Sequence, residues 1–497
     1  MTTPTVTTVA APLARVLLPL GVGLLLSACG GGGGGGTSGA DPATTPATAS
    51  SFAPSISLAN QCASPRPNTA DTQGSVAQEK AYLRAFVDES YLWYRDVPGN
   101  LVAANYATAP AYFEVLKTPA VTASGAAVDQ FHWSQTTASW NAEMAGQAQD
   151  YGIRWAALAN SPPRNWVVAE VAPGSPAAQL GVQRGFKVTS IDGVDFVSDN
   201  TAAGVAILNQ GLSPTVAGAH GFGFNGGAEL SMSPGPYQVT TVQRVQTFAT
   251  AKDVVGYFSF DSHLAQSEGE LIAAINQLKA ANVSDLVIDM RYNGGGMLYI
   301  ASELAYMIAG PDATAGKVFE QASYNDKLVA RNTTYGFAFY GTTPVGSLPT
   351  LGLKHVTVLT TRSTASASES VINSLRGVDV SVDLMGATTR GKPYGFAPQD
   401  NCGYTYFAIQ FKGVNNKGFG DYADGFAPTC AAADDYSHAR GDSAEAMLSA
   451  ALSYRLTGLC PLHASAQALR AGSGNGGAGG LALVPPATPQ LRILTTQ

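Results

Sequence analysis

A serine hydroxyl and a lysine amine lie close enough in the sequence to form one catalytic site. Ser366 precedes Lys392 by 26 residues, and the stretch between them has the pattern of one helix followed by one strand. A serine hydroxyl is a weak nucleophile until a neighbouring base takes its proton. Lysine can be that base when burial lowers its pKa enough to keep the amine neutral near pH 7. The pair therefore predicts a hydrolase.

The elements around these two residues would place both at strand ends. Residues 355–361 form an apolar, β-branched run typical of a buried strand, and residues 367–376 have helical apolar spacing. Ser366 thus falls at a helix start, where free N–H groups and the helix dipole stabilise an oxyanion. Lys392 follows a second strand-like run, residues 380–385. Taken singly, a helix cap and a solvated surface lysine remain the commoner interpretations.

A third segment could supply main-chain hydrogen-bond donors. Residues 285–290 predict a short buried strand that runs into a glycine turn, and residues 297–308 predict an amphipathic helix after it. Glycine permits a positive φ and close backbone approach, as an oxyanion hole made of N–H groups requires. A tight strand-to-helix turn without chemistry is the alternative.

In this order, the three segments resemble the S41 family of C-terminal processing peptidases. They are Asp289-Met-Arg-Tyr-Asn-Gly-Gly-Gly296, Thr364-Ala-Ser-Ala-Ser-Glu369 and Gly386-Ala-Thr-Thr-Arg-Gly-Lys392. The resemblance implies that Ser366, rather than Ser363 or Ser368, is the nucleophile and that Lys392 is the base. It also implies a mixed α/β catalytic core of the crotonase-like type. The donors it implies for the oxyanion hole are the amides of Ala367 and of Gly295 or Gly296.

One position departs from the family pattern. The family often has a glutamine four residues after the lysine to orient it, whereas this chain has Phe396 there. Glu369 or Gln399 could substitute, so the third member of the site stays open.

An upstream segment resembles a PDZ domain. Residues 168–193 have its succession of strand, turn, short helix of small residues and strand ending in Ile-Asp-Gly, and residues 203–212 fit the helix beside the peptide groove. Such domains add an extended peptide to a sheet edge and bind its terminal carboxylate through backbone N–H groups. A small β-domain without a ligand is the alternative. The residues expected to form the carboxylate-binding loop are Tyr151, Gly152, Ile153 and Arg154.

The first residues predict export and lipidation. Arg15 precedes an apolar run over residues 16–26, too short to span a bilayer and typical of a signal peptide. Leu26-Ser-Ala-Cys29 resembles a bacterial lipobox, which implies cleavage before Cys29 and a lipid on that cysteine. Because Gly30 rather than aspartate follows, the resemblance implies the outer membrane, facing the periplasm, within the bacterial cell envelope.

Composition divides the chain into parts. The Gly/Ala/Thr/Pro-rich stretch after the leader cannot build a core and predicts a flexible tether, and the chain turns to Gly, Ala and Pro again after residue 463. The predicted parts are a signal peptide (1–28), the tether (29–58), a helical domain (59–147), the PDZ-like domain (148–247), the S41 core (248–463) and a flexible tail (464–497).

Four further cysteines would be oxidised in that compartment. They allow three pairings, and the sequence does not choose among them. We favour Cys402 with Cys430, because both flank one loop-rich insert, and Cys62 with Cys460, which would join the ends of the body.

Other kinds of site have weaker support. No Cys-x-x-Cys pair and no His-Glu-x-x-His motif suggests a metal, and no cofactor is expected. The net charge of −7 without a basic cluster disfavours nucleic acid. We therefore predict a lipid-anchored periplasmic serine endopeptidase that selects proteins or peptides by their free C-termini. The alternatives are a non-catalytic scaffold or binding lipoprotein of the same fold, and an esterase that pairs the serine with His438.

Overall fold

The computed structural model describes residues 52–213, 218–339, 341–461, 481–483 and 492–493. The predicted leader, Cys29 and most of the predicted tether and tail lie outside this part of the chain. The described residues form several sheets and helices in a mixed α/β arrangement, so the predicted fold class is confirmed. No helix among the described residues is long and apolar enough to cross a membrane.

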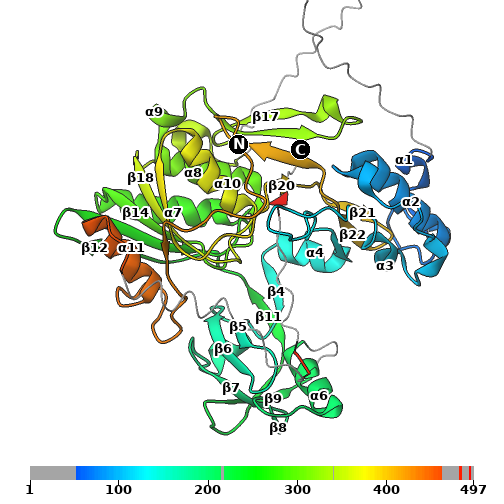
Figure 1. The fold of residues 1–497 in the computed structure, drawn as a ribbon, viewed down its shortest axis with the longest axis horizontal. Coiled ribbons are helices and arrows are strands. Elements are labelled where there is room, and N and C mark those ends of the chain that lie inside the picture. Colours follow the sequence, from blue (N-terminus) through cyan, green and yellow to red (C-terminus); the bar gives the residue numbers. More distant parts are fainter. Residues whose placement is uncertain (1–51, 214–217, 340, 462–480, 484–491, 494–497) are drawn as a thin grey trace, which may run out of the picture. The chain divides into compact units, whose positions relative to one another are not determined.

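The largest sheet positions the candidate site. Its strands follow the order β12-β13-β14-β18-β19-β24, and every pair except β12 with β13 is parallel (Figure 1). Parallel strands covered on both faces are buried along most of their length, as β14, β18 and β19 are. The strands are β12 (Val242–Ala249), β13 (Val254–Phe260), β14 (Asp285–Asp289), β18 (His355–Thr360), β19 (Ser381–Gly386) and β24 (Cys430–Ala431).

Helices cover both faces of this sheet. Within β13, Phe258 and Phe260 pack into the cluster formed with α7 (Ser267–Ala280), α8 (Leu298–Ala309) and α10 (Ala367–Gly377). Alternate residues of the same strand, Val255 and Tyr257, pack instead with α11 (Ala446–Thr457). This alternation follows from the two-residue period of a strand. The loops that follow the parallel strands lie at the carboxyl ends of those strands, which is where α/β folds bind ligands.

A second sheet contains β20, the strand that directly follows the lysine segment. Its order is β17-β16-β23-β20, with all pairs antiparallel. The strands are β16 (Val318–Tyr324), β17 (Thr333–Gly336), β20 (Tyr394–Gly395) and β23 (Phe411–Val414). The short helix α9 (Pro311–Thr314) precedes it.

The N-terminal segment shares a core with the catalytic half. Strand β3 (Trp133–Thr136) pairs with β22 (Tyr404–Phe407), which pairs with β21 (Gln399–Asn401). Its four helices are α1 (Ser55–Leu58), α2 (Val76–Ser90), α3 (Ala109–Phe113) and α4 (Thr137–Met144). Helix α1 falls within the predicted tether, where the Ser55 amide donates to Glu89 at 2.7 Å. The end of that tether is therefore folded.

The PDZ-like segment is entered and left through one antiparallel pair, β4 (Gln147–Asp150) with β11 (Gly235–Gln238). The predicted boundary at residue 247 falls inside β12, which belongs to the largest sheet. Its other elements are β5 (Ile153–Ala159), β6 (Asn165–Val171), α5 (Pro176–Gln179), β7 (Val188–Ile191), β8 (Val194–Asp195), α6 (Ala202–Leu212), β9 (His220–Phe224) and β10 (Leu230–Met232).

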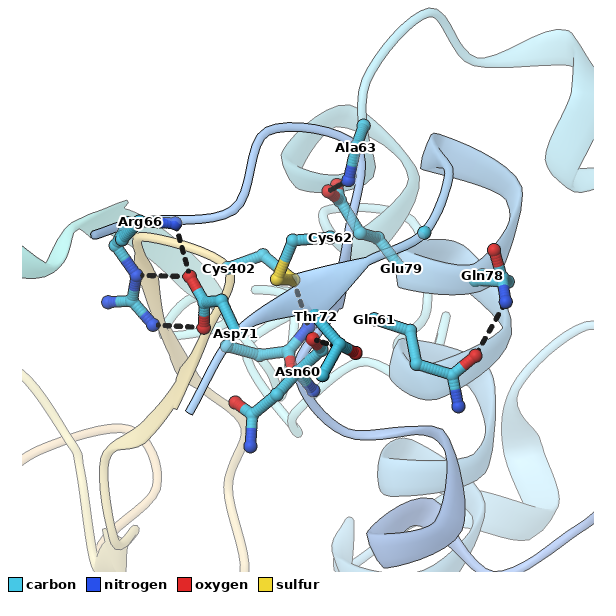
Figure 2. The surroundings of a disulfide bond; sticks show 12 residues. Asn60, Gln61, Cys62, Ala63, Arg66, Asp71, Thr72, Gln78, Glu79 and Cys402 are labelled. Atoms are coloured by element: carbon cyan, nitrogen blue, oxygen red, sulfur yellow. Dashed lines mark hydrogen bonds and ion pairs between the residues drawn. A yellow bond between two sulfur atoms is a disulfide. The ribbon is translucent and has the colours of Figure 1, made fainter. Parts of the chain in front are cut away.

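Both predicted disulfide pairings are wrong. Cys62 is bonded to Cys402, with their Cα atoms 5.3 Å apart, and Cys430 is bonded to Cys460, with Cα atoms 5.5 Å apart. Cys402 lies in the turn between β21 and β22, which packs on the N-terminal segment rather than on the rest of its insert. Figure 2 shows Cys402 beside Cys62, which lies in β1 (Gln61–Cys62), the partner of β2 (Thr72–Gln73).

Candidate active site

Three loops meet beyond the carboxyl ends of β14, β18 and β19. The Arg390 amide donates to Thr364 O at 2.9 Å, which joins the lysine loop to the serine loop. The Ala365 amide donates to Asn293 O at 3.0 Å, which joins the serine loop to the glycine turn. The parallel order of the strands thus brings together the three motifs identified in the sequence.

Ser366 occupies a strained backbone position at the start of α10. Its φ of 61° is rare for a residue with a side chain, and the whole residue is buried. A strained strand-to-helix turn of this kind is one way in which hydrolases present a nucleophile. The next amide, that of Ala367, is the first of α10, and it donates to no other group in the described part of the chain. The hydroxyl therefore lies beside an available main-chain donor.

The Glu369 carboxylate joins the serine to the lysine loop. Its Oε2 accepts from the amides of Ser366 at 2.8 Å and Lys392 at 2.9 Å, so these two backbone nitrogens lie within two hydrogen-bond lengths of each other. Its Oε1 accepts from the Gly391 amide and the Thr389 hydroxyl. Burial raises the pKa of Glu369, and the donors partly oppose that rise. Glu369 thus orients the backbone of both candidate catalytic residues.

Lys392 is held in an apolar environment. It is fully buried, and its Nζ lies 4.8 Å from the ring centre of Phe131 and 4.5 Å from that of Phe396. Burial lowers the pKa of Lys392 to about 7, although the charges of Asp129 and Glu369 act in the opposite direction. A lysine with this pKa is partly neutral at pH 7 and can accept a proton. Phe396 is therefore one of the apolar groups that pack against the amine.

Gly391 sets the direction of the chain into Lys392. Its φ is 87°, and a Cβ added there would lie 2.2 Å from Ala423 O. No other residue type fits this turn without moving the 421–425 loop. That loop also lines a cavity of about 300 Å³ with Thr122 and Val128 of the N-terminal segment.

The glycine turn is fixed by His263 and Asn293. The Asn293 Oδ1 accepts from the Gly295 amide at 2.9 Å and faces His263 Nδ1 at 3.1 Å, so this ring nitrogen carries the hydrogen. Burial lowers the pKa of His263 to about 3, so the ring is neutral. A Cβ on Gly296 would lie 2.4 Å from His263 O, so the close approach of these backbones requires glycine.

Other residues considered from the sequence lie elsewhere or have other partners. Gln399 lies on β21, and its amide donates to Asp400 O at 3.4 Å, so it does not orient the lysine. The Ser368 hydroxyl donates to Asn293 O at 3.1 Å. His438 Nδ1 faces Asp435 Oδ2 at 2.6 Å on the surface, whereas Ser366 is fully buried. The structure therefore does not pair Ser366 with His438.

Two residues near the lysine were not identified from the sequence. Asp129 and Phe131 belong to the loop before β3, far from the motifs along the chain, and their only local signal is an aspartate among aromatic residues. Asp129 is buried and accepts from Tyr91 Oη at 2.6 Å and from the Phe131 amide at 2.9 Å. The N-terminal segment therefore helps to form the environment of Lys392.

The expected carboxylate-binding loop lies at the start of β5. Gly152 has a φ of 75° and its amide donates to Asp150 Oδ1 at 2.6 Å, while Tyr151 is buried in the core of this segment. Ile153 and Arg154 begin β5 itself. Among the described residues β5 pairs only with β6, which leaves its second edge open.

A buried group of charges lies between the PDZ-like segment and the glycine turn, and we call it the arginine cluster. Arg291 contacts Asp289 at 2.9 Å and Glu445 at 2.8 Å, and Arg440 contacts Asp289 at 3.2 Å and Glu170 at 3.0 Å. Burial alone would lower the pKa of both guanidinium groups, but the carboxylates raise it well above the usual value. The members of the cluster are Arg184, Arg291, Arg440, Glu170, Asp261, Asp289, Asp434 and Glu445.

The comparison with known families agrees with this geometry. Residues 254–399 match the sequence profile of peptidase family S41, and they contain the glycine turn, Ser366 and Lys392. The chain carries an S41 peptidase domain. No group of His, Cys, Asp and Glu among the described residues has an arrangement that could hold a metal ion.

Individual relatives of the S41 domain are distant. A carboxyl-terminal-processing protease of Picosynechococcus sp. is 26% identical over 234 residues, which cover 44% of this chain and 49% of that protein. The chain thus matches about half the length of this curated relative. A Bacteroides fragilis protein assigned to the S41 proteases has a similar fold, with a TM-score of 0.61 and 24% identity over 76% of this chain and 98% of that one. A photosystem II D1 C-terminal processing protease gives a TM-score of 0.41 at 17% identity, over 72% and 93% of the two chains.

Proposed function

We propose that this chain is a serine endopeptidase in which Ser366 is the nucleophile and Lys392 the general base. The observation that carries the proposal is the environment of Lys392: a fully buried amine between two aromatic rings, with a pKa lowered to about 7. Its backbone shares one Glu369 oxygen with that of Ser366. Such a lysine is costly to bury and has a clear use as a proton acceptor beside a serine.

The proposed reaction has two stages. Lys392 takes the proton of Ser366 as Oγ attacks the scissile carbonyl carbon, and it then gives that proton to the leaving amine as the C–N bond breaks. A water molecule, deprotonated by Lys392, hydrolyses the resulting ester and restores the serine. The Gly295 amide already donates to Asn293. We therefore assign the oxyanion to the amides of Ala367 and Gly296.

A serine series tests this assignment. Ser366→Ala should abolish cleavage of an unfolded protein substrate, because it removes the attacking atom. Ser363→Ala and Ser368→Ala are matched controls in the same loop and should keep at least about a tenth of the activity. If Ser366→Ala retains activity while one of the controls loses it, the nucleophile is wrong. If the folded wild-type chain binds peptides but cleaves none, it is the scaffold lipoprotein instead.

We also propose that the PDZ-like segment selects substrates by their free C-termini. Support comes from the open edge of β5, to which an extended peptide could add as a strand, and from the turn at Gly152 where that strand begins. A substrate with a free terminus should be cleaved faster than matched substrates with an amidated or an Asp-ended terminus, because amidation removes the anion and aspartate places a charge in the expected apolar pocket. Equal cleavage rates for all three substrates would show that the PDZ-like segment does not select substrates by their C-termini.

The proposed location is the periplasmic face of the outer membrane, with a lipid on Cys29. The leader pattern supports export, and the disulfide bonds suit an oxidising compartment. Mass spectrometry of the amino-terminal peptide should find an acylated cysteine, and Cys29→Ala should release the protein from membranes. An unmodified leader on the membrane-bound protein would contradict the proposal.

A further inference from the structure

A segment from late in the same chain lies beside the glycine turn of the candidate site. Strand β25 (Arg492–Ile493) pairs in parallel with β15 (Gly296–Met297), in the register Gly296 to Arg492 and Met297 to Ile493. The other side of Gly296 is bridged to His263. The strand that contains the proposed oxyanion donor is therefore bordered by β25 on one side.

The same segment also reaches the lysine side of the site. Strand β25 lies beside β20, which starts two residues after Lys392. In Figure 1 the short red strand lies next to the label of β20. An extended segment between the glycine turn and the lysine loop is where a substrate must lie for Ser366 to attack it. Both Ser366 and Lys392 are fully buried in this arrangement.

A second contact holds this part of the chain on the PDZ-like segment. The Leu481 amide donates to Asn200 Oδ1 at 2.7 Å, and Arg164 donates to Leu481 O at 2.8 Å. The Leu483 amide donates to Asn160 O at 3.1 Å, directly after β5, and the Leu483 side chain is buried in the core of that segment. Residues 481–483 thus lie between the end of β5 and the start of α6, at one end of the proposed peptide groove.

We propose that the segment Arg492–Ile493 is a substrate of the chain's own active site. This inference rests on the proposed peptidase function. Ser366 attacks the carbonyl carbon of Arg492 or Ile493, the following C–N bond breaks, and Lys392 transfers the serine proton to the released amine. Water then hydrolyses the ester, leaving a new carboxyl terminus at residue 492 or 493. Until that cut is made, the segment competes with other substrates for β15.

The test follows the intact mass of the full-length chain, purified in detergent, over time. The expected result is a product that ends at residue 492 or 493, formed at a rate independent of protein concentration, because the substrate is on the same chain. Ser366→Ala should keep its full mass. Ile493→Pro should block the product, since proline removes an amide from the strand and fixes φ. The same variant should cleave an added unfolded protein several-fold faster at first.

Two further variants separate the outcomes. Asn200→Ala removes the acceptor for the Leu481 amide at an exposed position and should slow self-cleavage several-fold. In the inactive Ser366→Ala background, Ile493→Pro should speed amide exchange at Gly296, whereas the Met297 amide, which donates to His263 O, is the internal control. A wild-type chain that cleaves added substrate but keeps its full mass and shows no faster initial rate with Ile493→Pro overturns this inference alone. A chain that cleaves neither substrate overturns the proposed function with it.

Discussion

Two buried positive centres of this molecule respond to burial in opposite ways. Lys392, Arg291 and Arg440 are all buried. The pKa of Lys392 falls to about 7, whereas the carboxylates around Arg291 and Arg440 raise the pKa of both. The difference lies in the partners. Phenylalanine rings pack against the lysine amine, and carboxylates lie 2.6 to 3.2 Å from the guanidinium groups of Arg291 and Arg440.

This difference separates a group that can exchange a proton from groups that cannot. Burial disfavours a charge, and only a close opposite charge compensates for it. The arginine cluster is compensated and therefore permanently charged, and it joins Glu170 of the PDZ-like segment to Asp289 at the end of β14. For the lysine, burial outweighs the charges of Asp129 and Glu369, so its pKa lies near 7. The arginine cluster is suited to holding two parts of the molecule together, and Lys392 is suited to general base catalysis.

The largest expected effect is the loss of activity when Lys392 is replaced. Lys392→Ala and Lys392→Arg should both lower kcat/KM by about 10³-fold or more, because neither side chain can accept the serine proton. Lys392→Met should be as inactive yet at least as stable as the wild type in thermal unfolding, since it removes a buried amine. His438→Ala is the control and should retain near-normal turnover. A loss comparable to that of the lysine variants would favour the esterase alternative.

The second-largest effect should be a loss of stability when an ion pair of the arginine cluster is removed. Arg291→Leu leaves Asp289 and Glu445 buried without their main partner, so the free energy of unfolding should fall by about 3–5 kcal/mol. The matched control is Arg95→Leu, which breaks an exposed pair with Asp326 and should cost about 1 kcal/mol or less. Urea denaturation of both variants measures the difference. An equal fall in the free energy of unfolding for both variants would show that the ion pairs of the arginine cluster stabilise the protein no more than an exposed ion pair does.

The sequence predicted the parts of these centres that depend on local pattern. Residues 355–361 and 367–376 were predicted as strand and helix, and they correspond to β18 and α10 because their apolar periods are those of buried elements. The three motifs also meet as expected, since the carboxyl ends of parallel strands lie at one edge of a sheet.

The remaining parts depend on contacts between distant residues. Asp129 approaches Lys392, and Cys62 bonds Cys402, only because β3 pairs with β22. No local pattern encodes that pairing. Gln399 was a reasonable candidate by spacing, but β21 carries it away from the lysine. The sequence therefore indicated which residue types act, but not the surroundings that set the pKa of the base.

A smaller effect should come from making the lysine environment polar. Phe396→Gln restores the residue common in the family, and it should raise the pKa of Lys392 by readmitting a polar group beside the amine. The acidic limb of the kcat/KM profile, expected near pH 7 in the wild type, should then move to higher pH. Phe396→Leu keeps the site apolar and should leave the limb in place. Similar profiles for both variants would show that the ring does not control the base.

The smallest effect tests the charge of Asp129 near the amine and should have the opposite sign. The Asp129 carboxylate favours protonated Lys392, so Asp129→Asn should lower the pKa of the lysine and move the acidic limb to lower pH. Asparagine keeps an oxygen for the Phe131 amide, and its NH₂ can donate to Tyr91 Oη, so the loop should keep its shape. An unchanged melting temperature would confirm this. A limb that moves to higher pH would mean that Asp129 acts by holding Phe131 over the amine, because losing that ring would readmit water and raise the lysine pKa.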